Sequence, residues 1–137
     1  EYDIILVDCS PSLGLLTVNA LTAADGILIP IQCEYLALEA LGQLTSTLEL
    51  IRDNLNPRLH LVGIVMTMFD ARTNLSQQVV EQVRKHFPDR VFAAIVPRSV
   101  RLSEAPSYGQ PITAYDSSSR GASAYRKLAA ELIPRLS

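Results

Sequence analysis

One carboxylate is placed where it could serve a bound metal ion. Asp8 directly follows the apolar run Ile4 to Val7. Such a run, without polar alternation, is typical of a strand buried on both faces of a parallel sheet. An aspartate held at the end of that strand can lie beside a phosphate-bound Mg²⁺, usually acting through a water because Mg²⁺ gives up its waters reluctantly. The alternative interpretation is an acid that caps the following turn.

Polar residues also follow two later apolar runs. Thr67 and Asp70 come after 61–66, while Pro97 and Arg98 come after 92–96. In parallel sheets ligands bind beyond the carboxyl ends of the strands, so these residues are candidates for a ligand site. For Thr67 and Asp70 the alternative is a strand-end threonine and an acid that caps the next helix.

The sequence contains no phosphate-binding loop. Neither G-x-x-x-x-G-K-[ST] nor G-x-G-x-x-G occurs, and the six glycines are isolated from one another. The backbone N–H groups that would cradle phosphates are therefore missing from these residues. We expect this chain alone to bind nucleotide poorly.

Other reactive side chains give weaker signals. Cys9 and Cys33 each end an apolar run, which favours reduced thiols over a disulfide framework. A catalytic role for Cys9 is the less favoured interpretation, since His60 and His86 are the only imidazoles. Neither histidine has a Cys or His at a metal-binding spacing.

Charge is distributed unevenly along the chain. Residues 1–71 hold two basic and nine acidic residues, whereas residues 72–137 hold ten basic and five acidic ones. This asymmetry favours contact between the second half and an anionic partner, although helix surfaces that simply differ in charge would give the same count. No apolar stretch approaches about 18 residues, so we expect no membrane span.

The chemistry-bearing residues must be positioned by alternating strands and helices. Apolar runs predict strands over 2–8, 27–31, 61–66 and 92–96, with a possible short strand over 112–114. Helical periodicity predicts helices over 15–24, 41–55, from a cap at Ser76 to Phe87, and from 120 onward. The segment 98–119 is predicted to be a polar loop. Four strand–helix alternations in 137 residues indicate one α/β domain, a parallel sheet with helices on both faces.

Four segments together resemble one protein family. They are YDIILVDCSPSLGLLTVNAL (2–21), IPIQCEYLALE (29–39), TMFDARTNL (67–75) and VPRSVRLSEAPSYGQP (96–111). The first resembles the Walker B and switch II stretch of the ParA/Soj partitioning ATPases, with Asp8-Cys9-Ser10-Pro11 in place of the family's Asp-x-Pro-Pro. Ser10 restores a backbone donor that proline lacks and loosens this turn.

The resemblance implies a P-loop NTPase-like fold of the deviant Walker A type, of which residues 1–137 would be the carboxyl-terminal part without the P-loop strand. It implies ATP and Mg²⁺ as cofactors of a homodimeric parent protein. Asp8 would support Mg²⁺ through a water, and Pro11 would belong to switch II. Thr67, Asp70, Pro97 and Arg98 would lie near the base.

The resemblance also implies a second, anionic ligand. Arg72 and Arg101 match family positions associated with non-specific DNA binding, and Arg84, Lys85, Arg98 and Arg120 are weaker candidates. Such binding needs only cations that contact phosphates. A ParB-like protein would be the partner, in the cytoplasm and on the nucleoid.

Two alternatives remain open from the sequence. A membrane-associated positioning ATPase of the MinD type would need a basic amphipathic tail, for which residues 126–136 offer only a short stretch. An inactive interaction module would self-associate through unpaired sheet edges.

Overall fold

The computed structural model describes residues 2–10 and 14–136. Along the chain it contains α1 (Leu15–Ala23), β1 (Gly26–Gln32), α2 (Ala37–Asn54), β2 (His60–Phe69), α3 (Asn74–His86) and β3 (Val91–Pro97). These are followed by α4 (Val100–Glu104), η1 (Ala105–Tyr108), α5 (Ile112–Tyr115), α6 (Arg120–Leu132) and η2 (Ile133–Arg135).

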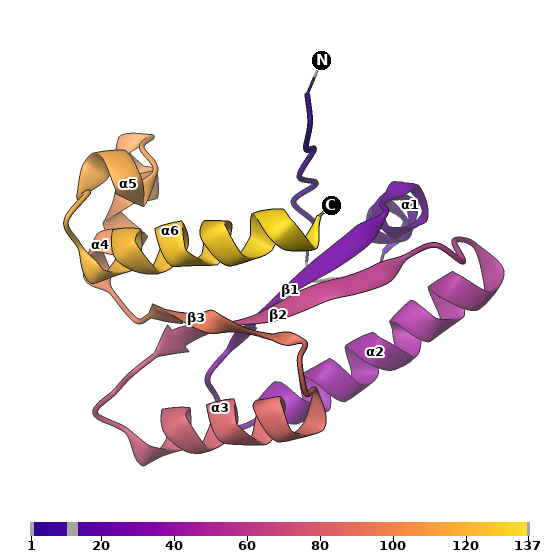
Figure 1. The fold of residues 1–137 in the computed structure, drawn as a ribbon, viewed down its shortest axis with the longest axis horizontal. Helices are drawn as coiled ribbons and strands as arrows, with labels where there is room; N and C mark the ends of the chain where they lie inside the picture. Colours follow the sequence, from indigo (N-terminus) through magenta and orange to yellow (C-terminus); the bar gives the residue numbers. More distant parts are fainter. Residues whose placement is uncertain (1, 11–13, 137) are drawn as a thin grey trace.

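The sheet is parallel, with the strand order β1-β2-β3 (Figure 1). The order in space follows the order in sequence, so α2 connects β1 to β2 and α3 connects β2 to β3. The three strands predicted over 27–31, 61–66 and 92–96 are confirmed. Their carboxyl ends consequently meet at one edge of the sheet, as parallel pairing requires.

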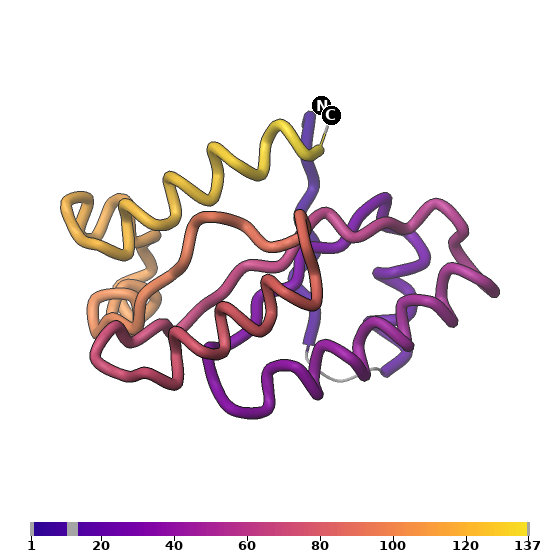
Figure 2. Tube along the Cα trace, turned by 60° about the horizontal axis from the view of Figure 1, so that its bottom comes forward, coloured from indigo at the N-terminus to yellow at the C-terminus, as the bar shows by residue number. Residues whose placement is uncertain are grey.

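Helices cover both faces of the sheet, as predicted. Figures 1 and 2 show α2 and α3 on one side of the strands and α6 on the other. The larger core lies between β2 and the α2–α3 layer, and its fully buried side chains include Leu41, Ile64, Met66 and Val83. A second core joins β3 to α6 through Phe92 and Leu128, among others. Burial of these apolar side chains is the main force that holds the layers together.

Polar caps begin two of the long helices. The Thr73 side chain accepts a hydrogen bond from the backbone N–H of Ser76, and α3 begins at Asn74. The cap predicted at Ser76 is therefore three residues too late, because Thr73 already satisfies the free N–H of the first turn. Ser119 caps α6 in the same way, through the N–H of Ala122.

Two irregularities interrupt the ladders. Ile27 pairs with Leu61 but Leu28 pairs with Gly63, so Val62 is an extra residue in β2. Between β2 and β3 the register jumps from Ile64↔Val91 to Met66↔Ile95, which leaves the middle of β3 out of step with β2. There the Glu131 carboxylate of α6 accepts the backbone N–H groups of Ala93 and Ala94, both at 2.8 Å.

The strand predicted over 2–8 is not formed in this structure. The segment is extended but unpaired, and Tyr2, Ile5 and Leu6 are 89%, 78% and 78% exposed. Figure 1 shows it leading away from the sheet as an indigo trace. The reason is hydrogen bonding: an apolar run becomes a buried strand only beside a neighbouring strand, and within the described residues none pairs with it.

The segment 98–119 is also more regular than predicted. It forms α4, η1 and α5 in succession, so the short strand expected over 112–114 is in fact helix. Pro106 lies in the first turn of η1, and Gly109 ends it with φ +64°, a conformation that glycine adopts at little cost. The rings of Tyr108 and Tyr115 then stack at 5.1 Å.

Within residues 2–10 and 14–136, no helix is both long and apolar enough to span a membrane.

Candidate functional site

The loops that follow the three strands are tied together at the carboxyl edge of the sheet. The backbone N–H of Cys33, after β1, donates to the Thr67 carbonyl at 2.9 Å. The N–H of Arg98, after β3, donates to the Phe69 carbonyl at 2.9 Å. These bonds continue the ladder beyond the strands, so the predicted residues at the ends of β2 and β3 are brought together.

The last residues of β2 are held by a side-chain hydrogen bond and include an unusual backbone conformation. The Thr67 hydroxyl donates to the Ile31 carbonyl of β1 at 3.1 Å, which fixes this side chain against the neighbouring strand. Met68 then has φ +54°, a conformation that crowds the Cβ of a residue other than glycine. Strained backbone of this kind is concentrated at functional sites.

The Asp70 carboxylate accepts three hydrogen bonds from Arg72. Its Oδ1 accepts the backbone N–H and the Nε–H of Arg72 at 3.0 and 2.9 Å, and its Oδ2 accepts Nη2–H at 2.7 Å. The Arg72 guanidinium, and next its backbone N–H, hold the pKa of Asp70 well below its ordinary range. The same pairing raises the pKa of Arg72. Sequence reasoning predicted both residues but not their pairing.

A second ion pair crosses from β1 to β3. Arg98 Nη2 lies 3.7 Å from Glu34 Oε1, in the loop after β1. The Arg98 charge also contributes to the low pKa of Asp70. Charged side chains from all three strand-end loops therefore act on one another at this edge. Glu34 was not predicted, because its partner lies two strands away and no spacing in the sequence reveals it.

Arg101 lies in α4, just beyond β3, and is held by two carboxylates. Its Nη1 is 3.2 Å from Glu104 Oε2, and its Nε is 3.6 Å from Asp116 Oδ2. The Tyr115 hydroxyl donates to the same Glu104 oxygen at 3.2 Å. The Tyr115 hydroxyl, and then the charge of Glu104, raise the pKa of Arg101. Glu104, Tyr115 and Asp116 were not predicted, because 98–119 was expected to be a loop. The short helices that this segment forms bring these residues close to Arg101.

Asp8 lies at the exposed end of the extended segment 2–10. Within the described residues no hydrogen bond or ion pair joins it to Thr67, Asp70 or Arg98, so the structure does not bring it together with the other predicted residues. Pro11, the other predicted catalytic residue, falls outside the described residues. No described group of three or more acidic, Cys or His side chains could hold a metal ion. A lone carboxylate fits Mg²⁺ all the same, since Mg²⁺ commonly takes one or two carboxylates together with waters and phosphates.

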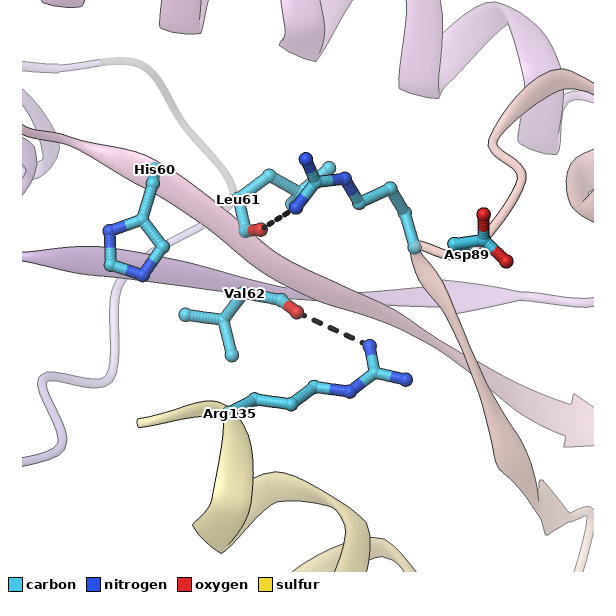
Figure 3. Close-up of a pocket in the computed structure, with 6 residues that line it drawn as sticks. His60, Leu61, Val62, Asp89 and Arg135 are labelled. Carbon is cyan, nitrogen blue, oxygen red and sulfur yellow. Dashed lines mark hydrogen bonds between the residues drawn. The ribbon is translucent and has the colours of Figure 1, made fainter. Parts of the chain in front are cut away.

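A surface pocket of about 310 Å³ lies at the opposite edge, near the amino ends of β2 and β3 (Figure 3). Arg90 and Arg135 each donate one N–H there, to the Leu61 carbonyl at 3.2 Å and the Val62 carbonyl at 3.3 Å. Arg135 also lies over the Phe92 ring, 4.1 Å from its centre. These arginines satisfy carbonyls around the extra residue of β2, so their evident role is structural.

Comparisons with known proteins identify relatives of this chain. The AAA domain family matches residues 1–61. Chromosome partitioning protein ParA of Myxococcus xanthus is 58% identical over 98% of this chain and 48% of its own length. Sporulation initiation inhibitor protein Soj of Bacillus subtilis is 57% identical over 96% of this chain and 52% of its own. The chain thus spans about half the length of these curated relatives.

Solved structures show the same fold. Cobyrinic acid a,c-diamide synthase from Mycobacterium smegmatis, with bound ATP analog and magnesium, superposes with a TM-score of 0.75 at 36% identity. The match covers 96% of this chain and 47% of that one. The predicted α/β fold class is confirmed, and so is the resemblance that the four segments indicated.

Proposed function

We propose that residues 1–137, which are similar in sequence to the ParA and Soj proteins, form the carboxyl-terminal part of the nucleotide-binding domain of a chromosome-partitioning ATPase. The observation that carries the proposal is identity of 58% over 98% of the chain. The network of charged residues at the carboxyl edge supports it, because that edge is where parallel sheets bind ligands.

We propose ATP and Mg²⁺ as the cofactors of the full-length protein. The neighbouring synthase has been solved with an ATP analog and with ADP, each with magnesium, which supports a nucleotide on this fold. Asp8 would hold Mg²⁺ through a water, with Pro11 in the adjoining switch segment. Bound Mg²⁺ would neutralise charge on the phosphates. Thr67, Pro97 and Arg98 are the proposed contacts to the base. The sequence also suggests Asp70, but both of its carboxylate oxygens accept hydrogen bonds from Arg72.

Residues 1–137 carry no motif that cradles phosphates. We therefore propose that they do not hydrolyse ATP by themselves.

We further propose that the ATP-bound homodimer binds DNA without sequence preference through Arg72 and Arg101. Both guanidiniums are exposed close to the carboxyl edge, with side chains 86% and 58% accessible. Each retains N–H donors that its carboxylate partners do not use, and such donors suit phosphate oxygens. We also propose a ParB-like partner protein that stimulates ATP hydrolysis. The ATPase itself would be cytoplasmic and associated with the nucleoid.

The DNA proposal is tested on the full-length protein with ATP and a duplex of random sequence. Arg72→Ala and Arg101→Ala should each weaken binding about tenfold and lower the slope of log affinity against log salt by about 1, because each removes a phosphate contact. Arg58→Ala, an exposed arginine just before β2, is the matched control. Unchanged affinity and slope in both variants would refute the assignment. Binding to anionic vesicles in place of DNA would favour the MinD-like alternative.

A further inference from the structure

The hydrogen bonds to Asp70 use only one edge of the Arg72 guanidinium, and the N–H donors of its other edge are not used by Asp70. A guanidinium carries five N–H donors, and Asp70 takes the Nε–H and one Nη2–H. Three donors remain, two on Nη1 and one on Nη2. They form the end of a side chain that is 86% exposed. Two neighbouring N–H groups on that end match two oxygens of one phosphate.

Asp70 is in turn fixed by the start of α3. Its backbone N–H donates to Ser76 Oγ at 3.2 Å, and its carbonyl accepts the Thr73 hydroxyl at 3.1 Å. The Asp70 side chain is only 19% exposed. The direction of Arg72 is therefore set by β2 and α3, through Asp70. An exposed arginine without such a partner samples many rotamers, and it would lose this conformational entropy each time it bound a phosphate.

We propose that Asp70 is a positioning residue for DNA binding, which holds the free edge of Arg72 toward a phosphate. The inference rests on the DNA binding proposed above. It gives Asp70 a role different from the base contact that the sequence suggests, because both carboxylate oxygens are already committed to Arg72. The Arg101 pair is looser, at 3.2 and 3.6 Å, so the effect is expected mainly at Arg72.

The sign of one substitution separates this role from simple electrostatics. Asp70→Asn removes a negative charge beside DNA, and charge alone predicts tighter binding. Loss of positioning predicts weaker binding instead, because an amide offers only one acceptor oxygen and cannot hold both N–H groups. We expect Asp70→Asn to weaken DNA binding about three- to tenfold and to lower the salt slope by about 1, as Arg72→Ala does.

The experiment is fluorescence anisotropy of the full-length protein with saturating ATP and a short random duplex, from about 50 to about 200 mM salt. Asp53→Asn is the matched control, because it makes the same chemical change at an exposed position of α2. That control should bind DNA within about twofold of the unsubstituted protein, since its charge lies away from the arginine. A double-mutant cycle with Arg72→Ala completes the set.

The cycle distinguishes the possible failures. If Asp70 acts through Arg72, Asp70→Asn no longer weakens DNA binding in the Arg72→Ala background, where only the loss of a negative charge remains and binding is unchanged or slightly tighter. If it acts through the nucleotide, it still weakens DNA binding there, and the positioning role is overturned. Unchanged or tighter binding by Asp70→Asn alone also overturns it. If Arg72→Ala itself binds DNA like the unsubstituted protein, the DNA contact proposed for Arg72 fails first.

Discussion

At the scale of single residues, the pairing of Asp70 with Arg72 has a consequence for pH. The pKa of Asp70 lies below its ordinary value because Arg72 donates to both of its oxygens. A carboxyl group whose folded pKa is depressed adds stability above its unfolded pKa, about 3.9, and this stability is lost as the pH falls. The pair is thus complete at neutral pH and weakens only in acid.

Arg72→Gln tests this linkage. The variant keeps the backbone N–H but loses the charged donors, so the pKa of Asp70 should rise toward about 3.9. The fall in stability between about pH 4 and pH 2 should become smaller than in the unsubstituted protein. NMR titration of the Asp70 carboxyl group, together with unfolding midpoints across this range, measures both effects. An Asp70 titration that is the same in both proteins would show that Arg72 does not cause the shift.

Substitution of alanine for glycine is expected to change stability in opposite directions at two positions. A Cβ at Gly63 would clash with the Phe92 ring and lie 2.9 Å from Arg135 Nη1, so Gly63→Ala should destabilise by about 1 to 3 kcal/mol through overpacking. A Cβ at Gly42, on the exposed side of α2, meets nothing within 4 Å. Gly42→Ala should therefore stabilise by about 0.5 to 1 kcal/mol, because alanine favours helix. Denaturant unfolding measures both, and a shift in the same direction for the two variants would contradict the packing described around Gly63.

At the scale of elements, α6 protects the irregular part of β3. Glu131 accepts two backbone N–H groups where β3 is out of step with β2. Such unpaired groups on a strand invite pairing with another chain.

Glu131→Ala should consequently destabilise the fold by about 1 to 2 kcal/mol, allowing for partial exposure of the carboxylate, and should increase aggregation. Equilibrium unfolding and light scattering measure the two effects. Glu81→Ala, exposed on α3, is the control and should behave like the unsubstituted protein. A Glu131→Ala variant indistinguishable from that control would mean that the carboxylate does not protect the strand.

The elements that the sequence predicts are those whose own residues determine them. The apolar runs of β1, β2 and β3 lie beside one another, and α3 buries the side chains that its periodicity indicates. In the last helix the predicted stripe of Tyr125, Leu128, Leu132 and Leu136 is only partly right, because Leu128 is buried but Tyr125 and Leu136 are exposed. The run over 2–8 has the same composition but no described neighbour, so its pattern alone does not make it a strand. Residues 98–119 fail for the opposite reason: Tyr108, Tyr115 and the Arg101 carboxylates stabilise turns through contacts made only after folding.

The same division holds for the candidate site. Asp70, Arg72, Arg98 and Arg101 could be chosen from the sequence, because strand-end position and family resemblance both single them out. Their carboxylate partners could not, since Glu34 and Asp116 come from loops that are distant in sequence. Only the fold shows which charges meet.

At the scale of the whole molecule, the basic second half of the sequence divides between two edges of the sheet. Arg72, Arg98 and Arg101 lie near the carboxyl edge, whereas Arg90 and Arg135 cap carbonyls near the amino edge. The charge asymmetry is therefore not one continuous patch. The carboxyl edge carries the guanidiniums that are proposed to meet phosphates, on the side where nucleotide is also proposed to bind.

The most direct test of the proposed ATPase is hydrolysis by the full-length protein in the presence of Mg²⁺. If Asp8 holds that ion through a water, Asp8→Asn should lower kcat by at least about tenfold, because an amide attracts the hydrated cation far less than a carboxylate does. Asp3→Asn, at the other end of the same apolar run, should keep kcat within about twofold, since it is placed away from the proposed ion. Hydrolysis by Asp8→Asn at the unsubstituted rate would contradict the account.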